Sequence, residues 1–219
     1  MLMATILGID EAGRGSVIGP LYVAGVMIDE KDEEKLRLTG VKDSKMLTPK
    51  KREELYPIIK RMAIDHVILK ITAQDIDNLR KVKNLNVIEA EKMAQIIKTL
   101  KADRAYVDAP QVSTEKFKAF LMNLAKNHTE IIAENKADEK YPVCSAASVL
   151  AKVNRDRDVE EIKRITGFDI GVGYSHDSRS IEFVKKYMKH KKFSKFIRHS
   201  WMTVETIKSE KEQKSLGDY

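Results

Sequence analysis

The sequence contains little cysteine and no long apolar run. Its 219 residues include one cysteine, Cys144, which excludes an intramolecular disulfide and a cysteine-rich zinc site. The first apolar segment is interrupted by Asp10, well short of the ~20 apolar residues that a membrane-spanning helix needs. It also lacks the basic start and the small-residue cleavage site of a secretory signal peptide. We therefore expect a cytoplasmic protein without a membrane span.

Charged and hydrophobic residues, by contrast, are plentiful. Hydrophobic residues make up 42% of the chain and charged residues 33%, a balance typical of a folded globular protein. The net charge of +7 favours a polyanionic partner such as nucleic acid, because Lys and Arg side chains that contact phosphates release counterions. A lysine-rich solvated surface gives the same charge balance, so the charge alone does not distinguish the two interpretations.

Apolar periodicity predicts strands that alternate with helices. Strands are expected at residues 4–9, 21–28, 65–71, 104–107 and 129–133. Helices are expected from Thr48-Pro49 onward, after Thr72, and at residues 84–100, 114–126 and 143–164. Early strands joined by a tight turn, followed by alternating strands and helices, predict an α/β fold with a mixed sheet flanked by helices.

The composition changes after Gly173. We expect a catalytic domain at residues 1–170, a small helical substrate-binding lobe at 171–208 and a flexible tail at 209–219. The lobe is a candidate surface for holding a nucleic-acid duplex, and the alternative is a solvated helix face. Its cations are Arg179, Lys185, Lys186, Lys189, Lys191, Lys192, Lys195 and Arg198.

Four carboxylates stand at the ends of predicted strands or just after one: Asp10, Glu11, Asp108 and Asp138. Strand ends of an α/β sheet are where functional sites usually lie. Clustered carboxylates repel one another and are stable mainly around a cation, and oxygen ligands suit Mg²⁺ or Mn²⁺. Asp10 and Glu11 are adjacent, so both reach one site only if the strand twists or ends there. The alternative is that each acid is a loop cap or a surface charge.

Several segments, in the same order as in the family, resemble the signatures of archaeal-type ribonuclease HII. The resemblance covers nearly the whole chain. The segments are GIDEAGRG at 8–15, KDSKML at 42–47, VDAP at 107–110, Ala137-Asp138, CSAASVLAKV at 144–153 with Arg155-Asp156, and GVGY at 171–174.

The resemblance implies a ribonuclease H-like core with a five-stranded mixed sheet flanked by helices, and a small C-terminal helical lobe. It implies that Asp10, Glu11, Asp108 and Asp138 are catalytic and bind Mg²⁺ or Mn²⁺, with two ions expected. Water then hydrolyses the phosphodiester on the 5′ side of a ribonucleotide, in an RNA–DNA hybrid or as a single ribonucleotide in duplex DNA. The products carry a 3′-hydroxyl and a 5′-phosphate. Ribonucleotide excision repair and RNA primer removal are the implied roles.

The resemblance also implies substrate contacts. Gly13, Arg14 and Gly15 would read the 2′-hydroxyl, partly through backbone groups, because glycine lets the backbone approach the sugar closely. Tyr174 would stack on the deoxyribose that follows the ribonucleotide. Lys45 and Lys152 are candidate phosphate contacts. The competing interpretations are a surface ion pair for Arg14, a core position for Tyr174 and a solvated helix lysine for Lys152.

Two positions depart from the usual family pattern. Ser16 stands where proline usually follows Gly-Arg-Gly, and Ser175-His176-Asp177 follows Tyr174 where Pro-Ser-Asp is usual. Loss of these prolines should loosen both loops. Because the acids and Tyr174 remain, we expect the rate and the selectivity for RNA–DNA junctions to be affected more than the reaction itself.

The last residues resemble the motif by which proteins bind the sliding clamp PCNA. Gln213, Leu216 and Tyr219 have the spacing of that motif, in which a short helical turn fills an apolar clamp pocket. The second aromatic residue of the motif is missing. The alternative is a disordered polar tail. Nothing in the sequence demands more than a monomer.

Three rival functions are weaker. A nucleic-acid-binding protein without catalysis explains the charge but leaves four acids unexplained. A nucleotide-binding enzyme is disfavoured because Gly13, Gly15 and Gly19 lack the G-x-G-x-x-G spacing and no G-x-x-x-x-G-K-[ST] segment exists. Another ribonuclease H-fold enzyme, of the HIII type or a DNA-cutting transposase, is disfavoured by the Gly-Arg-Gly and Gly-Tyr motifs.

Overall fold

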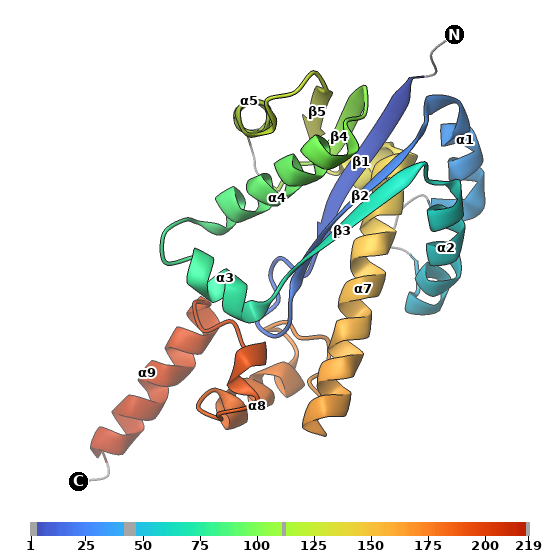
Figure 1. Cartoon of the computed structure of the whole chain (residues 1–219). Helices are drawn as coiled ribbons and strands as arrows, with labels where there is room; N and C mark the ends of the chain where they lie inside the picture. Colours follow the sequence, from blue (N-terminus) through green and yellow to red (C-terminus); the bar gives the residue numbers. More distant parts are fainter. Residues whose placement is uncertain (1–3, 42–46, 111–112, 218–219) are drawn as a thin grey trace. The chain divides into compact units, whose positions relative to one another are not determined.

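A five-stranded sheet with the order β3-β2-β1-β4-β5 forms the centre of the computed structural model, which describes residues 4–41, 47–110 and 113–217 (Figure 1). β1 is antiparallel to β2 and parallel to β4, and β4 is parallel to β5. The mixed five-stranded sheet is therefore confirmed. The strands are β1 (Thr5–Ala12), β2 (Leu21–Asp29), β3 (Asp65–Ile71), β4 (Arg104–Asp108) and β5 (Glu130–Glu134).

Helices connect the strands from β2 onward and follow the last one, whereas a loop joins β1 to β2. All the helices expected from apolar periodicity are present, within a few residues of the expected bounds. The short helices between Glu30 and Val41 were not expected, because that segment is highly charged and shows no apolar period. The helices are η1 (Glu30–Asp32), α1 (Glu33–Leu36), η2 (Arg37–Val41), α2 (Pro49–Met62), α3 (Ala73–Leu79), α4 (Leu85–Leu100), α5 (Thr114–Ala125), α6 (Ala137–Lys140), α7 (Pro142–Thr166), α8 (Ser178–Tyr187), η3 (Ser194–Phe196) and α9 (Met202–Gly217).

The chain divides into two compact units. The first combines the residues up to Ala12 with Tyr22–Lys70 and Leu85–Asn154, and it contains the sheet. The second combines Gly13–Leu21, Ile71–Asn84 and Arg155–Tyr219. No pattern in the sequence indicated that the segments Gly13–Leu21 and Ile71–Asn84 belong with the C-terminal helices. The expected division into a catalytic domain, a lobe and a tail stays a prediction.

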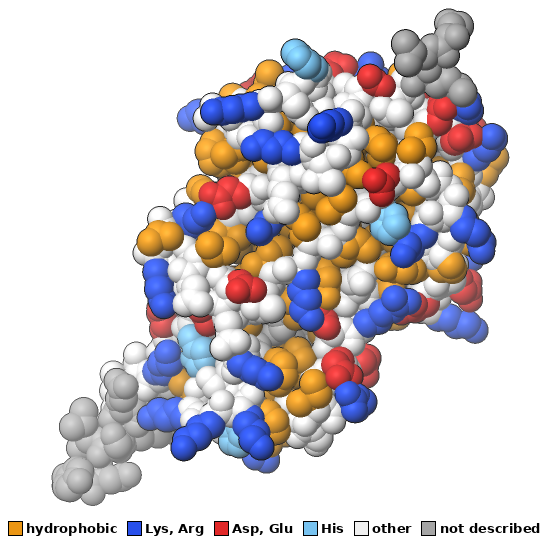
Figure 2. All heavy atoms as spheres, in the orientation of Figure 1, with side chains coloured by type: hydrophobic (Ala, Val, Ile, Leu, Met, Phe, Trp, Pro, Cys, Tyr) orange, Lys and Arg blue, Asp and Glu red, His pale blue; other side chains and the backbone are white. Residues whose placement is uncertain are grey.

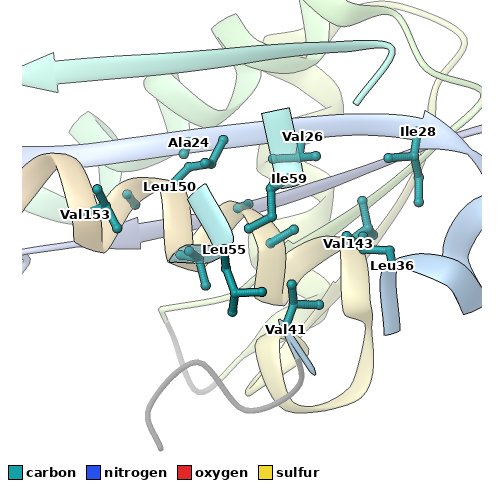
Figure 3. Close-up of a cluster of buried hydrophobic side chains, with 14 of the residues drawn as sticks. Ala24, Val26, Ile28, Leu36, Val41, Leu55, Ile59, Val143, Leu150 and Val153 are labelled. Atoms are coloured by element: carbon teal, nitrogen blue, oxygen red, sulfur yellow. The ribbon is translucent and has the colours of Figure 1, made fainter. Parts of the chain in front are cut away.

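Helices cover both faces of the sheet in the first unit. On one face, Ala24, Val26 and Ile28 of β2 pack in a buried cluster with residues of α2 and α7 (Figure 3). On the other face, a Cβ at Gly25 would meet Ile96 of α4, so that helix lies directly against β2. This layering buries the central strands β1 and β2, whereas the edge strand β3 is partly exposed.

The second unit has its own apolar core. Val17 and Ile18 are buried there with Phe183 of α8, Ile197 and Val204 of α9. Residues 209–217, expected as part of the tail, lie in α9, and the flexibility of this segment stays a prediction. Within the described residues, no helix is both long enough and apolar enough to cross a membrane.

Candidate active site

Three of the four expected acids come from neighbouring strand ends of the first unit. Asp10 lies on β1, and Asp108 is the last residue of the neighbouring parallel strand β4, one position beyond the Ile9–Val107 pair. Asp138 lies in the first turn of α6, just after β5. The Asp108 carboxylate accepts a hydrogen bond of 2.8 Å from the Ala137 N–H, which ties the end of β4 to the start of α6.

The Asp10 carboxyl is in an unusual electrostatic environment. Asp10 is 4% exposed. Burial raises the pKa of its carboxyl to about 7, and the charges of Asp108 and Asp138 raise this pKa in the same direction. Hydrogen bonds from the Ser148 side chain and from the Glu11 N–H, the latter 2.7 Å long, oppose this shift. Asp138 is 2% exposed. Such a buried concentration of negative charge favours binding of a cation.

Glu11 is placed differently from the other three acids. β1 stays regular through Ala12, with Glu11 paired to Val23 of β2. Because side chains alternate along a strand, the Glu11 side chain points to the face opposite that of Asp10. In the part of the chain that the structure describes, no three Asp, Glu, His or Cys side chains form a ready-made metal cage. The roles of all four acids therefore stay predictions.

Cys144 lies under this site as a structural residue. It is completely buried, and its thiol contacts the Tyr106 carbonyl oxygen at 3.2 Å. Burial raises the pKa of the thiol, and the nearby acids raise it further. Cys144 is therefore a poor nucleophile, as expected for a small buried residue.

The glycine segment Gly13–Gly15 lies in the second unit, beside Tyr174. Gly13 has a φ of 87°, and a Cβ there would lie 2.7 Å from the Pro20 carbonyl oxygen, so glycine is required. A Cβ at Gly15 would lie 3.8 Å from the Tyr174 ring, and Ser16 forms an isolated antiparallel bridge with Tyr174. The structure therefore brings together two motifs that are far apart in the sequence.

Tyr174 is half-buried at the surface of the second unit and is not a core residue. The Arg155 guanidinium lies over its ring, 4.8 Å from the centroid. The His176 ring is stacked near it, with centroids 5.6 Å apart and an interplanar angle of 20°. The departure from the family pattern at His176 therefore adds a second aromatic ring beside Tyr174.

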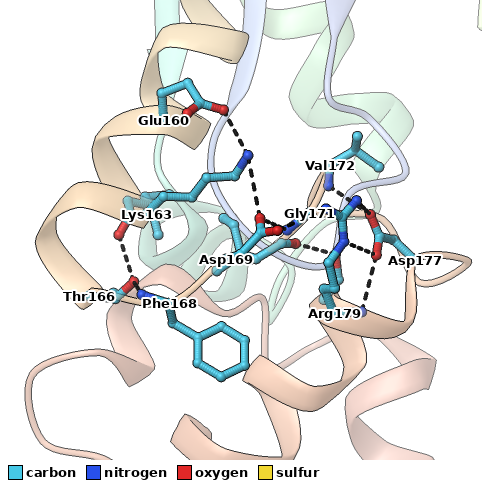
Figure 4. A network of polar contacts seen from close by, with 12 residues as sticks. Glu160, Lys163, Thr166, Phe168, Asp169, Gly171, Val172, Asp177 and Arg179 are labelled. Atoms are coloured by element: carbon cyan, nitrogen blue, oxygen red, sulfur yellow. Dashed lines mark hydrogen bonds and ion pairs between the residues drawn. The ribbon is translucent and has the colours of Figure 1, made fainter.

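Asp177 fixes the turn that precedes Tyr174 (Figure 4). Its carboxylate accepts a hydrogen bond of 3.0 Å from the Val172 N–H and caps α8 at the Arg179 N–H. The Arg179 side chain holds the pKa of Asp177 well below its usual range. A Cβ at Gly171 would overlap the Asp177 carboxylate, so glycine is also required there. The loss of the usual proline thus leaves this turn well anchored.

Arg198 corrects one expectation. The sequence placed it among the exposed cations of the lobe, but it is completely buried. Its guanidinium donates to the carbonyl oxygens of Gly19, Arg14 and Gly13 at 2.9, 2.9 and 2.7 Å. Burial lowers its pKa to about 9, so it stays charged at neutral pH. No local sequence signal separates this arginine from its exposed basic neighbours.

The structure describes only some of the remaining expected residues. Lys45 and Tyr219 lie outside the described residues. Lys152 is half-buried on α7. Gln213 is exposed on α9, and the backbone of Leu216 lies in the same helix. The structure therefore leaves the roles of these residues as predictions.

Comparison with known proteins identifies the family. The model of the family described as Ribonuclease HII matches residues 7–204, which is most of the chain. The chain belongs to the ribonuclease HII family. Ribonuclease HII of Pyrococcus furiosus is 43% identical over 219 residues, covering 97% of this chain and 96% of that protein.

Solved structures of ribonuclease HII agree with this assignment. The crystal structure of ribonuclease H2 from Pyrococcus horikoshii has a TM-score of 0.87 and 39% identity, covering 94% of this chain and 98% of that chain. The ribonuclease HII in a PCNA complex from Archaeoglobus fulgidus has a TM-score of 0.84 and 42% identity, covering 92% and 96%. The ribonuclease H-like fold and the resemblance to archaeal ribonuclease HII are thus confirmed. The chain is a metal-dependent endonuclease of the hydrolase class, which excludes the rival of a binding protein without catalysis.

Proposed function

We propose that this ribonuclease HII cuts the phosphodiester on the 5′ side of ribonucleotides, both in RNA–DNA hybrids and at single ribonucleotides in duplex DNA. The observation that carries the proposal is the buried Asp10 carboxyl, whose pKa is raised by burial and by the charges of Asp108 and Asp138. A site of this kind attracts cations and repels phosphates unless cations are present. It therefore suits metal-assisted hydrolysis of a phosphodiester.

The donor set fits Mg²⁺ or Mn²⁺. Asp10, Asp108 and Asp138 supply only hard oxygen atoms, which these ions prefer, and Glu11 belongs to the proposed set as the family's fourth acid. Hydrogen bonds from the Glu11 N–H to Asp10 and from the Ala137 N–H to Asp108 hold two of the carboxylates in place. Two bound ions would supply charge neutralisation at the phosphate and an activated water.

The reaction needs no side-chain nucleophile. The oxygen of water forms a bond to phosphorus, and the bond from phosphorus to the 3′ oxygen of the preceding nucleotide breaks. That 3′ oxygen takes up a proton, and the ribonucleotide keeps its 5′-phosphate. The protein contributes mainly positioning and electrostatic neutralisation, which suffice for in-line displacement at phosphorus.

Recognition of the ribonucleotide is proposed for Gly13, Arg14, Gly15 and Tyr174. The proximity of the glycine segment to the half-buried Tyr174 ring supports this role, because a ribose and the next deoxyribose are neighbours in the substrate. Lys45 and Lys152 are proposed to contact phosphates.

The lysines of the second unit are proposed to hold the duplex. Lys and Arg side chains cover the region around α8 in Figure 2. A pocket of about 280 Å³ in this unit is lined by the acid Asp77 and by polar side chains, and also by Lys191, Lys195 and His199. Such groups contact phosphates without reading the base sequence. Arg198 is excluded from this surface because it is buried.

Cleavage of three end-labelled duplexes with Mg²⁺ or Mn²⁺ tests the proposal: all-DNA, DNA with one ribonucleotide, and an RNA–DNA hybrid. We expect a single cut 5′ to the lone ribonucleotide and cuts along the RNA strand of the hybrid. The cuts should disappear in chelator and in Asp108→Asn, with a loss of at least about 100-fold in rate. Cleavage of the hybrid alone would contradict the proposed action on single ribonucleotides.

We also propose that the chain binds the sliding clamp PCNA through Gln213, Leu216 and Tyr219. The support is the PCNA complex of the Archaeoglobus fulgidus relative and the motif-like spacing in this chain. Clamp binding would fit roles in ribonucleotide excision repair and primer removal. A monomeric state and a cytoplasmic location complete the proposal.

A further inference from the structure

Ser16, which stands where the family usually has proline, is completely buried in the second unit. Its hydroxyl oxygen lies 2.5 Å from the Ile18 carbonyl oxygen and 3.0 Å from the Gly173 carbonyl oxygen. A serine hydroxyl has one proton to donate, so two acceptors from different segments share it. Proline has no hydroxyl, so this link depends on the serine.

The Gly173 carbonyl oxygen is the point at which the two segments join. It also accepts hydrogen bonds of 2.9 Å from the Val17 N–H and 3.1 Å from the Ile18 N–H. Gly173 directly precedes Tyr174, which forms an antiparallel bridge with Ser16. The turn that carries the tyrosine is therefore attached to the residues that follow the glycine segment.

Arg198 holds the same segment from the other side. Its guanidinium donates to the carbonyl oxygens of Gly13 and Arg14, while the Ser16 N–H donates to the Gly13 carbonyl oxygen at 3.3 Å. The carbonyl groups of Gly13 and Arg14 are thus fixed. The position of the segment relative to Tyr174 is set at the Gly173 carbonyl oxygen, where the Ser16 hydroxyl adds to the two backbone N–H donors.

We propose that Ser16 is a positioning residue for recognition of an RNA–DNA junction, an inference that rests on the proposed function. Its hydroxyl fixes the glycine segment, which reads the 2′-hydroxyl, relative to the Tyr174 ring, which stacks on the following deoxyribose. Without the hydroxyl, the buried Ile18 carbonyl oxygen loses this donor, and the Gly173 carbonyl oxygen keeps only the Val17 and Ile18 N–H groups, so the two segments are held less firmly. The hydrogen bonds of Ser16 thus take the place of the restraint that a proline ring would give at this position.

The two substrates should respond differently to loss of this link. A duplex with one ribonucleotide has one site where the 2′-hydroxyl and the following deoxyribose must both be contacted. A hybrid offers a 2′-hydroxyl at every position of its RNA strand and does not depend on a deoxyribose. Ser16→Ala should therefore lower kcat/KM for the lone-ribonucleotide duplex by about tenfold relative to the hybrid.

The test measures kcat and KM of the full chain on both duplexes for wild type, Ser16→Ala and Thr129→Val. Thr129 is a matched control, because its buried hydroxyl donates to the Ala102 carbonyl oxygen at 2.7 Å in the first unit, just before β5. Thermal unfolding of each variant measures the loss of stability. Thr129→Val should lose stability without a change in the ratio of kcat/KM between the two substrates.

A selective loss in Ser16→Ala, with an unchanged ratio in Thr129→Val, supports the proposal. An equal loss on both substrates in Ser16→Ala would overturn it, because Ser16 would then only stabilise the fold. If Ser16→Ala does not fold, Ser16→Cys gives the same comparison, since a thiol is a weaker donor of similar shape. Wild-type protein that fails to cut the lone-ribonucleotide duplex would refute the proposed function itself.

Discussion

At the residue scale, the buried carboxyl of Asp10 is placed where its negative charge lowers the stability of the fold but suits the binding of a cation. The folded chain disfavours its ionised form because burial and the charges of Asp108 and Asp138 act together. Its pKa of about 7 lies well above the model-peptide value of about 3.9. A functional site is a place where such a conflict is expected, since a bound cation would resolve it.

The Asp10 environment predicts a pH-dependent stability in chelator. The unfolded chain releases this proton near pH 4, whereas the folded chain holds it until about pH 7. Stability should therefore fall as the pH rises from about 4 to 7, and the penalty is complete above pH 7. Asp10→Asn should remove this dependence and raise the free energy of unfolding at pH 8 by about 1–3 kcal/mol.

Urea unfolding at several pH values in chelator measures the effect. Asp103→Asn is a suitable control with the opposite sign, because hydrogen bonds from the Thr5 N–H and hydroxyl hold the pKa of Asp103 below its usual value. Above pH 4, Asp103→Asn should therefore be less stable than the wild type. Parallel pH profiles for wild type and Asp10→Asn would show that Asp10 titrates normally.

At the element scale, the close approach of β1 and α7 builds the candidate site. A Cβ at Gly8 would overlap the backbone of Val143 and Cys144, so only glycine lets the helix lie against the strand. This contact sets the helix at the depth where Ser148 can hydrogen-bond to Asp10. The glycine in the first motif therefore has a packing reason that is separate from chemistry.

We predict that Gly8→Ala lowers the free energy of unfolding by about 3 kcal/mol, because neither backbone can yield to the added methyl group. Gly40→Ala serves as the comparison. Its φ is 87°, but its Cβ would have no atom within 4 Å, so only backbone strain of about 1–2 kcal/mol applies. Chemical denaturation of the two variants measures the difference. A smaller loss for Gly8→Ala than for Gly40→Ala would show that α7 can move away from β1.

At the scale of the whole molecule, the two compact units divide the proposed tasks. The first holds the acids, and the second holds the glycine segment, Tyr174 and the basic lobe. α9 extends the second unit through Gly217, so the proposed clamp motif overlaps the end of a helix. Cleavage and clamp binding should therefore be separable.

A chain that ends at Glu212 should cut free duplexes with unchanged kcat/KM and bind PCNA at least about tenfold more weakly, because the proposed plug residues are gone. Binding to PCNA immobilised on a surface measures the clamp affinity, and duplex cleavage assays measure kcat/KM. Gln213→Ala in the full chain is the matched control and should show a smaller loss of clamp affinity. Equal clamp affinity for the full and shortened chains would refute the role of the tail.

The sequence by itself determined the fold class and the order of the strands and helices, because apolar periodicity and caps are local signals. The resemblance located the acids and the glycine segment. Local patterns did not reveal that Arg198 is buried, because only carbonyl groups far away in the sequence define its role. Tertiary structure also decided that the Ser16 hydroxyl donates to the carbonyl oxygen of Gly173, which is 157 positions away in the sequence. Contacts between distant segments depend on packing, and packing is a property of the folded chain.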